Sequence, residues 1–150
     1  MFNIRNLIPA ALLAVSCAPA MAGGSGAEQA IRERIAVMEQ AWPKGDVGLI
    51  ARGVYGQDAV IQGEGQKATI QSPEGVDEVV KHLVSENKSV KLDIHSIRKL
   101  GADSALSWVT WHVTPKAADQ KPFDVKALFV WTRGKEGWRI RADMYTLGAM

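Results

Sequence analysis

The sequence predicts an α+β domain, in which a long N-terminal helix and shorter helices lie on the concave face of a cone-shaped, curved antiparallel sheet. One observation is the order of the patterns: helices and short strands come first, and four longer strands follow. The other is the alternation of apolar residues at every second position in 123–131 and 138–144, which gives each strand one apolar side. That side has to be covered, and the helices are the elements that can cover it.

Three helices are expected. The long helix begins near residue 27, and its apolar stripe recurs at steps of four, three and four: Ile31, Ile35, Met38 and Trp42. Pro43 ends it, because the residue before a proline is pushed out of helical geometry. Asp46 caps a short second helix that runs to Arg52. Ser72 and Pro73 begin the third, with a buried stripe made of Val76, Val79, Val80, Leu83 and Val84.

The strands are predicted as two hairpins and two short pieces. Residues 90–98 and 105–114 form one hairpin, and 123–131 and 138–144 form the other. Residues 59–61 and 68–71 read as brief strands. In the last hairpin the alternation predicts that these residues face the core: Phe129, Trp131, Trp138, Ile140, Ala142 and Met144. On the opposite side we expect an exposed or interfacial ion-pair ladder of Arg139, Arg141 and Asp143.

The N-terminus predicts export. Residues 1–22 combine Arg5, an apolar run too short to span a bilayer, and small residues before Gly23, which is the layout of a cleaved signal peptide. A flexible leader at 23–26 and one domain at 27–146 follow, in a periplasmic or secreted protein with no transmembrane segment in the mature chain. Lipid attachment at Cys17 is the alternative, although Ala14 fits that signal poorly.

Composition excludes several classes of function. The chain has 18 basic and 16 acidic residues, so loss of Arg5 leaves 17 against 16 and no basic run for nucleic acid or an anionic membrane. Cys17 is the single cysteine, so the mature chain has no thiol. The three histidines have no spacing typical of metal sites. We therefore expect no metal and no cofactor.

Four short segments resemble the nuclear transport factor 2-like superfamily, in its ketosteroid-isomerase-like and polyketide-cyclase-like branch. The resemblance covers about 27–146 and is carried by Gly45-Asp46, residues 55–60 (YGQDAV), Glu74-Gly75-Val76 and residues 137–140 (GWRI). It implies a cone-shaped fold, a homodimer through the sheet, and a deep pocket between the long helix and the concave face. It does not imply an activity, because one fold hosts many functions.

The catalytic positions of the steroid isomerases are not filled here. The motif spacing places Met38 where that family has its tyrosine, Gly63 where it has its base, and Ala127 where it has its second acid. Glu64 and Asp58 remain as weak candidates for a general base at the pocket rim. His112 and Asp93 are expected to meet across two strands on the face away from the core.

Large apolar residues suggest either a filled core or a binding pocket. The small side chains of Ala127 and Ala142 leave room for a cavity. The predicted ligand-binding residues are Met38, Trp42, Tyr55, Trp111, Ala127, Phe129, Trp131, Ala142 and Met144.

The leading hypothesis is an exported homodimer that binds a small apolar or aromatic molecule and has no acid or base inside its pocket. One alternative is an isomerase- or cyclase-type enzyme that uses Glu64 or Asp58. The other is an interaction module whose sheet surface docks a protein partner through Trp108, Leu128, Val130 and Tyr145.

Overall fold

The computed structural model describes residues 26–150, so the predicted signal peptide, Cys17 and most of the leader lie outside the described residues. The elements in chain order are α1 (Gly26–Ala41), the 3-10 turn η1 (Trp42–Lys44), α2 (Val47–Gly53), β1 (Tyr55–Gly63), α3 (Pro73–Glu86), β2 (Asn87–Lys99), β3 (Ser104–Pro115), β4 (Phe123–Gly134) and β5 (Gly137–Leu147). Within 26–150 no helix is both long enough and apolar enough to cross a membrane.

The helices begin and end close to where their sequence signals predict. The Asp46 side chain accepts a hydrogen bond from the Leu49 amide, and the Ser72 hydroxyl accepts one from the Gly75 amide, so both predicted caps are present. The stripe on α1 is fully buried at Ile31, Ile35 and Met38. Gly26 belongs to α1 rather than to the leader.

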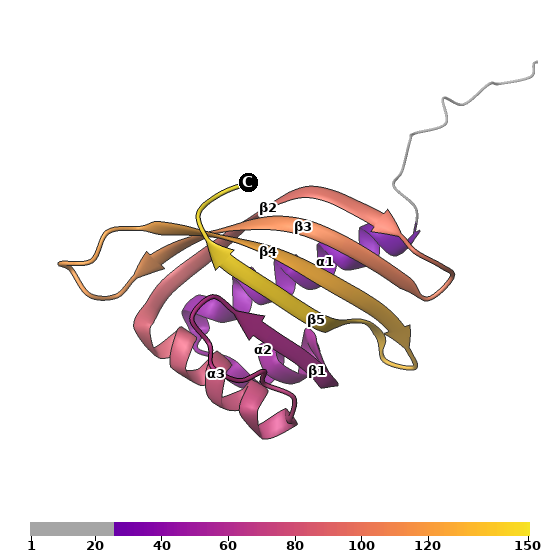
Figure 1. Cartoon of the computed structure of the whole chain (residues 1–150), viewed down its shortest axis with the longest axis horizontal. Helices are drawn as coiled ribbons and strands as arrows, with labels where there is room; N and C mark the ends of the chain where they lie inside the picture. The colour runs from indigo at the N-terminus through magenta and orange to yellow at the C-terminus, as the bar shows by residue number, and fades with distance from the viewer. Residues whose placement is uncertain (1–25) are drawn as a thin grey trace, which may run out of the picture.

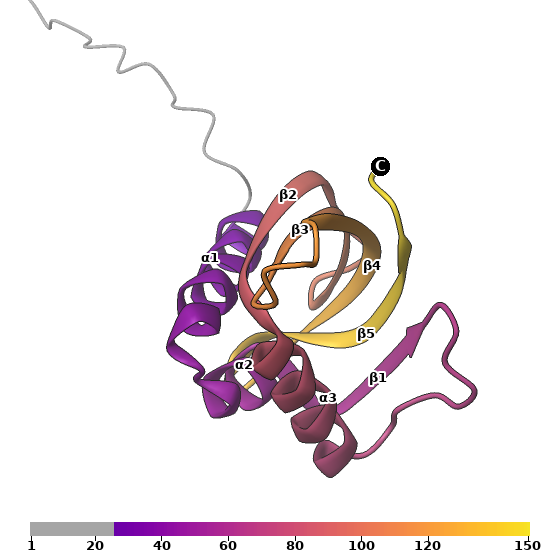
Figure 2. The same cartoon turned by 90° about the vertical axis from the view of Figure 1, so that its left-hand side faces the viewer.

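Five strands form one sheet in the order β1-β5-β4-β3-β2, and Figure 1 shows them side by side. The pairs among β2, β3, β4 and β5 are antiparallel as predicted, but β1 runs parallel to β5, which makes the sheet mixed. The strand expected at 68–71 is reduced to a single bridge between Ile61 and Ile70. The sheet is curved, and the helices lie along one side of it (Figure 2).

A β-bulge in β5 overturns one part of the predicted pattern. Trp131 pairs with Ile140, whereas its neighbour Val130 pairs with Ala142, so Arg141 is an extra residue with no partner on β4. An extra residue reverses which face the following side chains occupy. Asp143 is therefore buried, and Met144, predicted to face the core, is 62% exposed.

Four aromatic rings form the centre of the core. Trp42, Trp111, Phe129 and Trp131 follow one another edge to face, with centroid separations of 5.8, 5.9 and 5.8 Å. Two of the three indole N–H groups donate hydrogen bonds within the core, since Trp131 donates to the Ser107 hydroxyl at 2.9 Å and Trp42 donates to the Asn87 carbonyl at 3.3 Å. Much of the predicted pocket is therefore a filled core.

Candidate functional site

An apolar cavity of about 170 Å³ lies between α3 and the sheet. Its wall is drawn from α3, η1 and all five strands: Trp42, Tyr55, Ile61, Val79, Val80, Leu83, Asn87, Val90, Trp111, Val113, Phe123, Val125, Asp143, Tyr145 and Leu147. The resemblance implied a pocket beside the long helix. Here α1 is not part of the wall, and α3 takes its place.

The mouth of the cavity is marked by wall residues that are open to solvent. Leu83 on α3 is 37% exposed, Phe123 at the start of β4 is 41% exposed, and Leu147 at the end of β5 is 64% exposed. These side chains come from three elements that end near one another.

Asp143 is the one carboxyl group among the described residues of the cavity wall, and it is 6% exposed. The Tyr55 hydroxyl donates a hydrogen bond of 2.8 Å to its Oδ2. Its other oxygen, Oδ1, is buried and has no hydrogen-bond partner within residues 26–150. A buried polar atom without a partner costs about 1–3 kcal/mol, so this oxygen is a candidate contact for a ligand.

Burial changes the proton affinity of both groups. The loss of solvation raises the pKa of Asp143 from its ordinary 3.8 to about 7, while the hydrogen bond from Tyr55 works in the opposite direction. Burial, followed by the charge of Asp143, raises the pKa of Tyr55 well above its ordinary value. Tyr55 thus remains a hydroxyl donor, and Asp143 changes its charge near neutral pH.

The expectation of a pocket without an acid or base is therefore wrong. The ladder of Arg139, Arg141 and Asp143 does not form either, because the bulge at Arg141 turns Asp143 inward. Arg141 instead makes an ion pair with Asp58 at the surface. One feature of the sequence is a signal of this reversal: the large side chains of Tyr145 and Leu147 fall on the same side of the strand as Asp143. In the structure both of them line the cavity.

The two predicted rim carboxylates lie outside the cavity. Asp58 is exposed in its pair with Arg141. Glu64 is exposed and accepts hydrogen bonds from the Thr146 hydroxyl and the Leu147 amide, and these bonds lower its pKa. A general base at neutral pH needs a raised pKa and access to the substrate. Neither Glu64 nor Asp58 lines this cavity, and the pKa of Glu64 is lowered rather than raised.

The predicted ligand-binding residues divide into three groups. Trp42, Tyr55 and Trp111 line the cavity. The next group is buried in the core and is absent from the cavity wall: Met38, Ala127, Phe129 and Trp131. Ala142 and Met144 follow the bulge, so Ala142 is half-buried and Met144 is exposed.

The three steroid-isomerase positions also lack room for their functional groups. Met38 and Ala127 are enclosed in the core. Gly63 packs beneath the ring of Tyr145, so closely that a Cβ atom would overlap ring atoms. Any side chain at 63 would therefore displace Tyr145 from the cavity wall.

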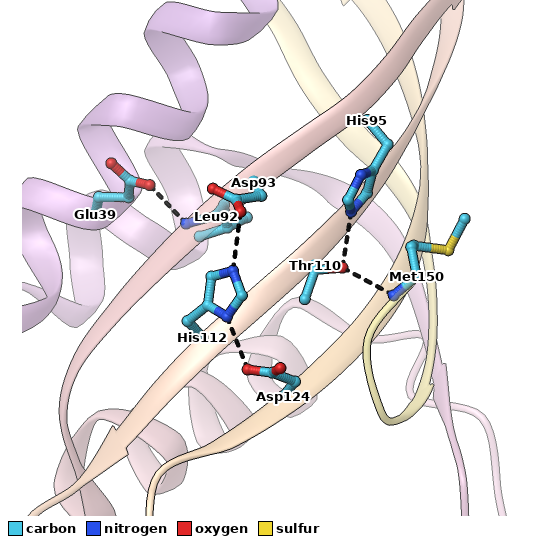
Figure 3. Close-up of polar contacts among 8 residues, drawn as sticks. All are labelled: Glu39, Leu92, Asp93, His95, Thr110, His112, Asp124 and Met150. Atoms are coloured by element: carbon cyan, nitrogen blue, oxygen red, sulfur yellow. Dashed lines mark hydrogen bonds and ion pairs between the residues drawn. The ribbon is translucent and has the colours of Figure 1, made fainter.

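His112 forms a second polar cluster on the outer face of the sheet (Figure 3). Its Nδ1 lies 2.7 Å from Asp124 Oδ1, and its Nε2 lies 3.1 Å from Asp93 Oδ2. The predicted contact with Asp93 is confirmed, although Asp93 pairs in register with Thr110. Asp124, and then Asp93, raise the pKa of His112 by hydrogen bonding. No nucleophile completes this cluster, and no group of three ligating side chains within 26–150 could hold a metal ion.

No protein family and no curated protein matches the sequence. Among solved structures, the chain is similar to a ketosteroid isomerase-like protein from Erwinia carotovora atroseptica SCRI1043, with 17% identity, a TM-score of 0.67, and coverage of 81% of this chain and 96% of the other. A domain of unknown function with a cystatin-like fold from Nostoc punctiforme has 18% identity, a TM-score of 0.70, and coverage of 85% and 81%.

A third similar structure is a nuclear transport factor 2-like protein of unknown function from Shewanella oneidensis MR-1. It has 16% identity and a TM-score of 0.65, and the match covers 79% of this chain and 98% of that one. At this level of identity the similarity shows the fold alone. The resemblance in the sequence is thus confirmed at that level: the chain has the nuclear transport factor 2-like fold.

Proposed function

We propose that this protein binds a small apolar or aromatic molecule in the cavity between α3 and the sheet, with Asp143 as the polar group that orients it. One observation carries the proposal: a buried carboxyl group with an unpartnered oxygen forms part of a largely apolar wall. Ligand pockets typically combine apolar walls with a few well-placed polar groups.

The cavity has the size for a single ring. Its volume of about 170 Å³ is close to the roughly 150 Å³ of an apolar cavity that accepts benzene. Trp42 and Trp111 form part of the wall, so a bound ring should change the fluorescence of the protein. Benzyl alcohol is a suitable neutral probe, because it carries one ring and one hydroxyl group.

A pair of variants tests this proposal. Val79→Phe places a larger side chain in the cavity, whereas Val37→Phe makes the same change at another half-buried helical position outside the cavity wall. We expect saturable binding of benzyl alcohol to the native protein and to Val37→Phe, and loss of binding in Val79→Phe. Equal binding by both variants would contradict the proposal.

The raised pKa of Asp143 favours a second candidate, catalysis of proton transfer. A carboxyl group that titrates near neutral pH can act as either an acid or a base. The ring opening of 5-nitrobenzisoxazole, which needs the removal of one proton, would report a buried base. The candidate requires a rate that rises with pH around 7 and that falls sharply in Asp143→Asn. A rate equal to that of free carboxylate in solution would exclude it for this substrate.

Export and dimerisation are further parts of the proposal. The composition of 1–22 supports secretion to the periplasm or beyond. The outer face of the sheet exposes Trp108 and Met144, at 39% and 62%, and this supports a homodimer through that face. Light scattering on the mature protein tests the dimer, and a monomer with a free sheet face would favour a docking partner instead.

A further inference from the structure

We infer that the ligand of this cavity is a small aromatic amine, whose protonated nitrogen pairs with the carboxylate of Asp143. The inference rests on the proposed binding function and goes beyond it by naming the chemical class of the ligand. It is carried by the geometry of the carboxyl group and by the chemistry of the wall around it.

The carboxyl group lacks a positive partner. The described residues of the cavity wall include no Lys, Arg or His. Two titratable groups face Asp143, Tyr55 on β1 and Tyr145 on β5, and both are phenols that carry no positive charge. The wall residues from η1, α3, β2, β3 and β4 are not titratable. Buried charges in proteins are normally paired, so this site leaves the cation to be supplied from outside.

The Tyr55 hydroxyl prepares the carboxyl group for such a partner. It donates to Oδ2 at 2.8 Å, which holds the group in place and favours its charged form. Oδ1 remains as an acceptor without a donor within residues 26–150. An ammonium group offers three N–H donors and a positive charge, so a single ligand atom would supply both the missing hydrogen bond and the missing charge.

The rings of the wall also suit a cation. Trp42, Trp111, Phe123 and Tyr145 all line the cavity. Aromatic faces attract cations when water is excluded, and tryptophan does so most strongly. A neutral hydroxyl or carbonyl ligand would use the apolar wall equally well, but it would leave Asp143 without a counterion whenever the carboxyl group is ionised. Charge is therefore the property that should distinguish good ligands from poor ones.

Benzylamine and benzyl alcohol provide a matched pair of probes, because they differ mainly in the charge of one group. At pH 8 we expect benzylamine to bind the native protein about tenfold more tightly or better, since hydrogen bonds to charged groups are the stronger ones. In Asp143→Asn the preference should disappear while benzyl alcohol still binds. Asp58→Asn, which removes an exposed carboxylate outside the cavity, should retain the full preference.

A pH series on the native protein keeps the test independent of whether Asp143→Asn folds. Because only ionised Asp143 pairs with the amine, the affinity for benzylamine should rise about tenfold from pH 6 to pH 8, and that for benzyl alcohol should not rise. Equal or tighter binding of the alcohol, or an amine preference that survives in Asp143→Asn, would overturn the inference and leave the proposed function intact. Failure of both probes to bind would overturn the two together.

Discussion

Tyr55 and Asp143 are 88 positions apart in the chain, yet the Tyr55 hydroxyl lies 2.8 Å from Asp143 Oδ2. The parallel pairing of β1 with β5 brings them together, because Tyr55 pairs with Ile140 and Ile61 pairs with Asp143. The same pairing adds β1 to the sheet edge. The pairing that places β1 at the edge of the sheet thus also completes the site.

Deprotonation of Asp143 should make the folded protein less stable as the pH rises. The folded protein binds this proton more tightly than the unfolded chain, because the pKa is about 7 in the fold and ordinarily 3.8. The contribution of Asp143 is therefore fully present below pH 4 and is lost as the pH rises to 7, at about 1.4 kcal/mol per pH unit. Urea unfolding at pH 5 and pH 8 should show that Asp143→Asn gains stability relative to the native protein at pH 8. If the difference in unfolding free energy between the two proteins were the same at pH 5 and pH 8, this prediction would be contradicted.

Tyr55→Phe should raise the pKa of Asp143 further. The hydrogen bond from Tyr55 stabilises the charged carboxylate, so its loss favours the protonated form. It also removes the hydrogen bond to Oδ2, so that neither carboxyl oxygen keeps a partner within residues 26–150, at a cost of about 1–3 kcal/mol to folding. An NMR titration of the Asp143 carboxyl carbon in the variant measures the first effect, and chemical unfolding measures the second. A lowered pKa would show that the bond does not act as described.

Gly63→Ala should destabilise the fold and disturb the cavity. The new Cβ would overlap the ring of Tyr145, which lines the cavity and whose hydroxyl accepts a hydrogen bond from Gln66. Such overpacking costs typically about 1–3 kcal/mol. Gly134→Ala is the matched control, because no heavy atom lies within 4 Å of its Cβ position and its φ is not positive. Thermal unfolding that is equally affected in both variants would refute the account of Gly63.

The two carboxylates beside His112 should have unequal effects on it. The hydrogen bond with Asp124 is the larger cause of the raised pKa, and the bond with Asp93 is the smaller. We expect Asp124→Asn to lower the pKa of His112 more than Asp93→Asn does. Because the pKa is raised in the fold, the stabilisation is complete below the unfolded value near 6.5 and is lost as the pH rises through the folded value. An NMR titration of the His112 ring checks the order, and a larger effect of Asp93→Asn would reverse it.

The sequence predicts the helices well, because their signals are local. Asp46 and Ser72 cap α2 and α3 with their own side chains, and the stripe of Ile31, Ile35 and Met38 matches the helical period. The two hairpins are also found, since alternation and turn residues lie next to each other in the chain.

Alternation alone could not predict the site, because one extra residue in β5 changes which of the following side chains are buried. The bulge at Arg141 depends on how β5 pairs with β4 and β1, and such pairing is not written in the local pattern of β5. Before the bulge Trp138 and Ile140 face the core as predicted. After it the buried position belongs to Asp143, which alternation had assigned to the outer face.

The pairing of β1 was missed for a related reason. Tyr55 begins a strand that pairs with β5 in parallel, although the two strands are far apart in the chain. A period-two pattern shows which side of a strand is apolar, but it does not show which strand is its partner. The place of Tyr55 beside Asp143 follows from topology. The strand order, the parallel direction and the register of β1 against β5 together bring the two residues into contact.

The fold buries a carboxyl group, without a positively charged partner, in the wall of a largely apolar cavity. A carbon-detected NMR titration of Asp143 in the ligand-free protein tests this burial most directly. We predict a midpoint near pH 7, about three units above that of an exposed aspartate. A midpoint near pH 4 would mean that Asp143 is solvated, and the cavity would then have no buried acid with which to bind or transform a ligand.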